Sequence, residues 1–207
     1  MWNWINQALQ NAEQAEHELL REMKADQLEQ ADWSASVEPV LKRMMLASRV
    51  TRHIQVRVLS LSILNAFALP HRTIVLSQPL VSFCEGRRDE LAFVLAHELA
   101  HITLGHANTR RWTNTALTAT PLANPLFGMG LRFLMERAFS REQEYEADAT
   151  AARTLHATGY AAAAGQQFLH RLRTTAMEPK LMTEWLQTHP PILDRIAQLQ
   201  QTLDGLQ

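Results

Sequence analysis

Residues 87–107, RRDELAFVLAHELAHITLGHA, decide both the fold and the chemistry expected of this chain. Apolar residues surround His97, Glu98 and His101 on most sides of the helix that this segment predicts, so we expect the helix to be buried. Buried polar groups without partners cost about 1–3 kcal/mol each, and a metal ion would supply the partner. Residues four apart lie on one helix face, so His97 and His101 can bind the same ion.

Glu98 follows the first of these histidines, about 100° further round the helix. From there its carboxylate can reach a water molecule at the metal without binding the metal itself. We therefore expect Glu98 to be a general base. A catalytic zinc usually has three protein ligands, so a third ligand must come from elsewhere.

Two nearby positions fail as the third ligand. The metzincin spacing requires Gly at 104 and His at 107, where this chain has Leu104 and Ala107. His106 would point away from His97 if the helix continued to that position, so we interpret it as a helix C-terminal residue.

The acidic segment 140–148, SREQEYEAD, is the better source of the ligand. It opens a second predicted helix, with Ser140 as its N-cap. Glu144 and Asp148 share one face of this helix, and Glu142 and Glu146 share another. Periodicity alone does not choose between the two pairs.

Composition limits the remaining possibilities. A chain of 207 residues that is 46% apolar predicts a single domain, 1–207, with an N-terminal helical region at 1–50 and a catalytic core at 51–207. The formal charge of -1 gives no reason to expect nucleic acid as a partner. Cys84 is the only cysteine, so histidine and carboxylate must supply most of the metal ligands.

The fold class predicted is α+β, mainly α. Amphipathic helical patterns cover about 2–28 and 38–52, and the segment 54–81 predicts two or three strands joined by turns. From residue 87 onward the pattern is helical, with breaks expected near 121–125, at Gly159 and at 190–191.

The start of the chain has no signal-peptide pattern, and no stretch reads as a convincing membrane span, so a cytoplasmic or membrane-peripheral protein is expected. Residues 112–131 carry no charge, but their prolines, glycines, threonines and asparagines suit a lipid-facing helix poorly. We interpret this segment as a buried connection, with a mobile flap or contact with a membrane surface as the alternative.

HELAH at 97–101, followed by E-x-x-x-D at 144–148, resembles the M48 zinc metallopeptidases, the group of CAAX prenyl protease 1, HtpX and bacterial quality-control metalloproteases. The resemblance implies a zincin-like (gluzincin) fold, with one zinc per chain bound by His97, His101 and Glu144. It also implies that Asp148 orients a ligand histidine, as carboxylates commonly do.

Three further segments extend the resemblance over roughly 50–200. They are 65–76, similar to the strand beside the family's substrate cleft, DELA at 89–92, and THPP at 188–191 with Arg195. The resemblance implies a zinc-dependent endopeptidase that acts on peptides or unfolded proteins, in quality control or processing, by a metal-activated water. His189 and Arg195 are then candidate donors to the oxyanion.

Two alternatives stay open. A peptide deformylase also uses HExxH but takes a cysteine ligand from far upstream, whereas Cys84 lies close to His97 and in the wrong order with its glycine. A non-proteolytic or latent zinc-containing binding module, of the chaperone or adaptor kind, is the second, although Glu98 would have no use in a structural site. The sequence names neither the substrate nor the oligomeric state.

Overall fold

The computed structural model describes residues 13–14, 16–17, 20–21, 33–48, 50, 53–61, 63–69, 72–106, 139–175, 189 and 192–206. The described elements, in chain order, are α3 (Ser34–Ala47), β1 (Gln55–Leu59), β2 (Ala66–Ala68), β3 (Thr73–Ser77), α4 (Gln78–Phe83), α5 (Arg88–Thr103), α8 (Arg141–Thr158), α9 (Ala164–Thr175) and α11 (Ile192–Asp204). The structure is mainly helical with one small sheet, as the sequence predicts.

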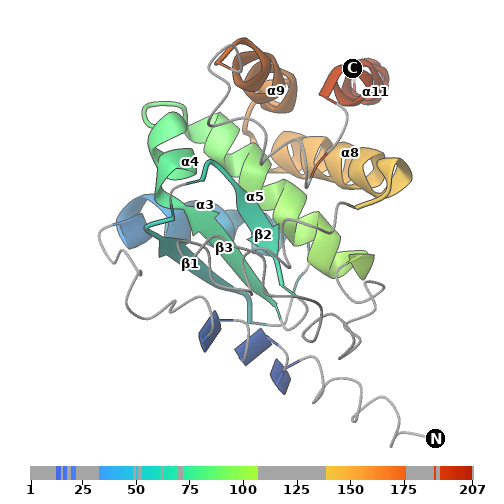
Figure 1. Cartoon of the computed structure of the whole chain (residues 1–207). Coiled ribbons are helices and arrows are strands. Elements are labelled where there is room, and N and C mark those ends of the chain that lie inside the picture. The colour runs from blue at the N-terminus through green and yellow to red at the C-terminus, as the bar shows by residue number, and fades with distance from the viewer. Residues whose placement is uncertain are drawn as a thin grey trace, which may run out of the picture.

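Helix α5 is the centre of the molecule. Every residue from Glu90 to His101 is buried. The helix lies between the sheet and helices α8 and α9, and α3 also packs on it (Figure 1). A helix covered on all sides needs no polar face, which explains why its sequence is apolar around the whole circumference.

The three strands form a sheet of order β1-β3-β2. Strand β1 pairs with β3 in parallel, and β2 pairs with β3 in the antiparallel direction. The connection between β2 and β3 turns at Arg72, which has φ of 78°. The prediction of strands within 54–81 is confirmed, and the sheet places the edge strand β2 against α5.

Helix α3 begins and ends earlier than the pattern 38–52 predicts, and it contains Pro39 in its interior. A proline there removes a backbone hydrogen bond and costs about 3 kcal/mol. The helix extends through it because four apolar side chains at helical spacing are buried against the core, namely Val37, Val40, Leu41 and Met44. Each such burial contributes about 1.5–3 kcal/mol.

The residues that begin and end helix α8 can be identified from the sequence. The Ser140 hydroxyl accepts from Gln143 N, and the Gln143 side chain accepts from Ser140 N, which is a capping box. Gly159 ends the helix with φ of 72°, in the left-handed region that glycine adopts readily. The break expected at this glycine is confirmed.

Helix α9 crosses α5 very closely. A β-carbon on Gly165 would overlap the ring of Phe93, so glycine is required at this crossing. Helix α11 packs on both α8 and α9 and completes the helical side of the molecule (Figure 1).

Several predicted segments lie outside the described residues. They include most of the predicted helix 2–28, the segment 112–131, and the breaks near 121–125 and at 190–191. Among the helices that the structure does describe, none combines the length and apolarity needed to cross a bilayer.

Candidate metal centre

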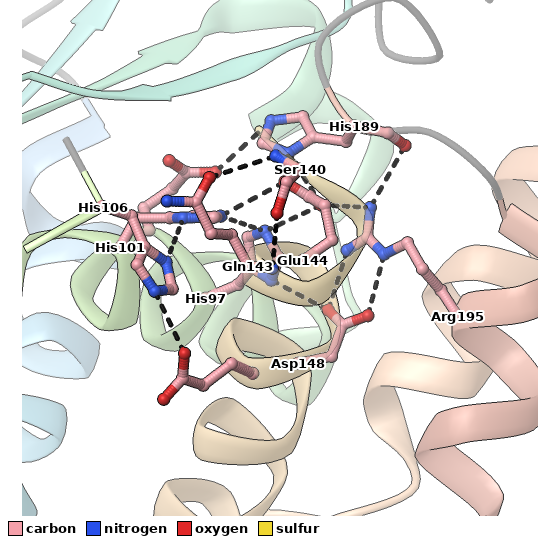
Figure 2. Close-up of polar contacts among 11 residues, drawn as sticks. His97, His101, His106, Ser140, Gln143, Glu144, Asp148, His189 and Arg195 are labelled. Atoms are coloured by element: carbon pink, nitrogen blue, oxygen red, sulfur yellow. Dashed lines mark hydrogen bonds and ion pairs between the residues drawn. The ribbon is translucent and has the colours of Figure 1, made fainter. Parts of the chain in front are cut away.

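Helices α5 and α8 bring three ligand-type side chains together. His97 Nε2 and His101 Nε2 lie 3.0 Å apart. The Glu144 carboxylate lies 3.5 Å from His97 Nε2 and 3.4 Å from His101 Nε2. All three side chains are buried. The two histidines project from successive turns of α5, and the carboxylate reaches them from the first turns of α8 (Figure 2).

His189 joins this group from the chain just before α11. Its Nδ1 lies 3.0 Å from Glu144 Oε1 and 3.1 Å from Oε2. One ligand atom from each of His97, His101, Glu144 and His189 lies within 4.8 Å of all the others. The four buried groups are therefore arranged as a metal site would require.

The spacing of the first three groups fits a tetrahedral ion. With metal bonds of about 2.0–2.1 Å, neighbouring ligand atoms in a tetrahedron are about 3.3–3.4 Å apart. The distances among His97, His101 and Glu144 are 3.0, 3.5 and 3.4 Å. Two imidazoles and one carboxylate also match the donor set of catalytic zinc sites.

Glu98 is fully buried beside this group, yet neither of its carboxylate oxygens accepts a hydrogen bond from the described residues. Its Oε1 lies 3.8 Å from His189 Nε2, beyond hydrogen-bond distance. A buried carboxylate without a donor among the described residues is expensive in a folded protein, so this position suits a partner such as a bound water molecule.

Asp148 lies one turn after Glu144 on α8. It contacts Nδ1 of His97, whereas Nε2 of the same ring faces His101 and Glu144. Its Oδ1 is 2.8 Å from His97 Nδ1. The guanidinium of Arg195, fully buried on α11, donates to both oxygens of Asp148 at 2.8 Å. Arg195 Nη1 also lies 3.0 Å from Glu144 Oε2, so one cation holds both carboxylates in place.

Burial and charge set the ionisation of these groups. Burial raises the pKa of Glu144, but the charges of His189 and Arg195 outweigh burial and hold that pKa well below its ordinary value. Burial likewise raises the pKa of Asp148, and Arg195 lowers it overall. Burial brings the pKa of His101 well below its ordinary value. The carboxylates are therefore anionic and His101 is neutral, as metal binding requires.

His97 has the opposite shift. Burial lowers its pKa, but the hydrogen bond and the charge of Asp148 outweigh burial, so the pKa lies above the ordinary value of histidine. The same carboxylate partner makes the imidazole more basic, which favours metal coordination.

The choice between the two acidic pairs follows from how α8 packs. Ala147, Ala151 and Leu155 are buried against the core, and this face carries Glu144 and Asp148 inward. Glu142 and Glu146 lie on the solvent side; the side chain of Glu146 is 59% exposed.

The interpretation of His106 was wrong in one respect. It assumed a continuous helix, but α5 ends at Thr103, and Gly105 has φ of 77°. The turn brings His106 back, so that its Nδ1 lies 3.0 Å from His101 Nδ1. The Gly-His pair after the last apolar residue of the helix was the signal for this return.

Phe139 is a site residue that sequence reasoning missed. Its ring stacks on that of His101, with centroids 3.7 Å apart and an interplanar angle of 11°. It precedes the N-cap of α8, and no motif marks it.

Cys84 is buried, and it is not a member of the ligand group found among the described residues. Burial raises the pKa of its thiol to about 12, so the thiol is protonated at neutral pH. The deformylase alternative therefore finds no support in the arrangement.

Comparison with known proteins places this chain among the peptidases. Residues 28–203 match the model of peptidase family M48. The mitochondrial metalloendopeptidase OMA1 of Danio rerio is 28% identical over 165 residues, which are 70% of this chain and 34% of the relative. The chain thus spans about a third of the length of that relative. The matched region of the family model contains the whole ligand group.

Proposed function

The chain belongs to peptidase family M48, and from this premise we propose that it is a zinc-dependent endopeptidase in which Glu98 is the general base. The proposal rests on the position of Glu98. Both of its oxygens are buried beside the ligand group without a hydrogen-bond donor among the described residues. A site that only held a metal would gain nothing from such a carboxylate, whereas a general base needs a free oxygen to accept a proton.

His97, His101 and Glu144 would hold the ion, one per chain. When bound, zinc supplies Lewis acidity toward water and toward a peptide carbonyl. Glu98 would accept the proton of the attacking water and deliver a proton to the leaving amine. Asp148 would keep His97 in the orientation and tautomer that present Nε2 to the ion, since it lies 2.8 Å from Nδ1.

His189 and Arg195 would have different roles. The donors of Arg195 are engaged by Asp148, by Glu144 and by the His189 carbonyl, so we assign it to holding the carboxylates rather than to the substrate. His189 Nε2 faces the side of Glu98, at 3.8 Å from Oε1, which makes it the better donor to the oxyanion.

The position of His189 also supports a second candidate, a latent form. Four protein ligands close a tetrahedral zinc site, and His189 is near enough to be the fourth. Replacing it distinguishes the two roles. If His189 donates to the oxyanion, His189→Ala keeps zinc and loses activity by about 10²–10³-fold. A rise in activity would instead favour the latent form.

The substrate is proposed to be an extended peptide or an unfolded protein, in quality control or processing. The sheet ends at β2, which pairs only with β3 among the described strands and packs on α5. An extended peptide can add to such an edge by main-chain hydrogen bonds, and β2 would place it beside the metal ligands. The name of the relative, a mitochondrial metalloendopeptidase, agrees with this class of reaction. Attachment to a membrane surface through 112–131, in a cytoplasmic or peripheral protein, stays a prediction.

The direct test compares the native chain with Glu98→Gln. Zinc per chain is measured after dialysis, together with cleavage of casein. The variant should keep one zinc and lose about 10²–10⁴-fold in rate, because only the proton acceptor has gone. Glu142→Gln, an exposed acid on α8, is the matched control and should behave as native. Activity that persists in Glu98→Gln would exclude the mechanism; zinc without activity in the native chain would favour the binding module.

A further inference from the structure

His106 makes a buried contact that the proposed reaction does not use. It is 5% exposed, and its Nδ1 lies 3.0 Å from His101 Nδ1. On its other side its Nε2 lies 3.2 Å from Glu146 Oε2. His106 thus connects Glu146, at the surface of α8, to the second ligand histidine. His101 and His106 are both labelled in Figure 2.

The direction of these hydrogen bonds follows from His101. Between two Nδ1 atoms at 3.0 Å, one must carry the hydrogen and the other must accept it. If His101 offers Nε2 to an ion, its hydrogen lies on Nδ1. His106 Nδ1 then accepts, which leaves the hydrogen of neutral His106 on Nε2. That N–H points to the carboxylate of Glu146.

We propose that His106 is a positioning residue that holds His101 in the metal-binding orientation by accepting its Nδ1–H, and that Glu146 fixes the tautomer of His106 that can do so. The inference rests on the proposed function, because it assumes that His101 binds metal through Nε2. His106 itself is not one of the four groups that converge. Its proposed effect on the metal is exerted through His101.

The two ligand histidines are thus held by different means. His97 is held directly by the buried Asp148 carboxylate. His101 is held by the imidazole of His106, and the carboxylate of Glu146, half in solvent, lies one residue further out. Phe139, stacked on the His101 ring, limits tilting of the ring but leaves its Nδ1 free to turn within the ring plane. A hydrogen bond in that plane is what His106 supplies.

Zinc affinity tests the proposal independently of activity. His106→Phe keeps a planar ring but removes the acceptor, and the dissociation constant, measured by competition with a chelator, should rise by about 10–100-fold. His106→Asn restores an acceptor oxygen and should recover most of the affinity. His170→Phe, at an exposed histidine of α9, is the matched control and should bind zinc as native.

The visible spectrum of the Co²⁺-loaded protein provides a second readout, since it reports ligand geometry rather than stability. It should change in His106→Phe and return toward native in His106→Asn. Native zinc affinity and a native Co²⁺ spectrum in folded His106→Phe would overturn the proposal.

A measurement on the native chain does not depend on any variant folding. Long-range ¹H–¹⁵N correlation of the histidine rings in the zinc-loaded protein should place the hydrogen of His101 on Nδ1 and that of His106 on Nε2. A hydrogen on His106 Nδ1 would overturn the inference while leaving the peptidase proposal intact. Failure of the native chain to bind zinc would overturn the proposed function, and this inference with it.

Discussion

Four polar side chains surround the buried Glu144. His97, His101, His189 and Arg195 all lie within 3.5 Å of its carboxylate. The charges of His189 and Arg195 keep its pKa well below the ordinary value although burial raises it. The group is thus ionised at neutral pH, and it is the acid of α8 that belongs to the ligand group found among the described residues.

Glu144→Gln should therefore lose metal. The amide has no charge and binds zinc weakly. The dissociation constant for zinc should therefore rise by more than roughly 100-fold, which is the largest loss usual for a residue that only orients a metal ligand. Metal per chain after gel filtration is the measurement. Glu142→Gln should retain the native value, because its carboxylate is exposed. Equal loss in both variants would contradict the proposed ligand.

At the scale of elements, the site depends on how three helices meet. Helix α8 lies along α5, and α11 packs on α8. Arg195 connects α11 to α8 through two hydrogen bonds to Asp148 and an ion pair with Glu144. Because the guanidinium is fully buried, its removal would leave two carboxylates without a cation in the interior.

Arg195→Met should destabilise the metal-free fold by about 3–5 kcal/mol, the usual cost of breaking a buried ion pair from one side. Urea denaturation measures it. The double variant Arg195→Met/Asp148→Leu should recover part of the loss, since one buried charge is removed with its partner. A single variant as stable as native would mean that water enters this part of the core.

The close approach of Gly165 to Phe93, where α9 crosses α5, leads to a separate prediction. Gly165→Ala should destabilise the protein by about 1–3 kcal/mol, because its β-carbon meets the Phe93 ring at the crossing. The melting temperature is the measurement. Gly205→Ala is the control, since the new methyl group would make only ordinary contacts of 3.5 Å and 3.8 Å with backbone oxygens. A neutral Gly165→Ala would show that the two helices can separate slightly.

For the whole molecule, a bound ion would connect parts of the chain that are far apart in sequence. The ligand group draws on α5, on α8 and on the residue three before α11. An ion that binds only the folded state stabilises it by mass action, about 2.7 kcal/mol at a hundred times the dissociation constant. A bound metal would therefore act on the fold as well as on the reaction.

Removing the metal with a chelator should lower the melting temperature of the native chain. Glu144→Gln should show little further change on chelation, because it binds little metal to begin with. Differential scanning calorimetry with and without chelator gives both values. An unchanged melting temperature in a chain that holds stoichiometric zinc would contradict the expected coupling between metal and fold.

Part of this arrangement was predictable because it is local. The pattern around HELAH predicts a buried helix with two histidines on one face, and Ser140 and Gly159 mark the ends of α8. The segment 54–81, with turn residues between two short apolar runs, predicts the strands. These features depend on side-chain periodicity, caps and glycine conformation, all of which act within a few residues.

By itself, the sequence determined the kinds of donor and the helices that carry them. The resemblance to M48 peptidases implied Glu144 and Asp148, but the physical reason that these donors converge lies in the tertiary structure. Periodicity left Glu144 and Glu142 equal, and the packing of α8 on α5 buried one of them. The turn at Gly105 places His106 beside His101, whereas in a continuous helix His106 would point away from the site. The reason is that convergence depends on how helices cross and turn, and those contacts join residues whose separation along the chain carries no periodic signal.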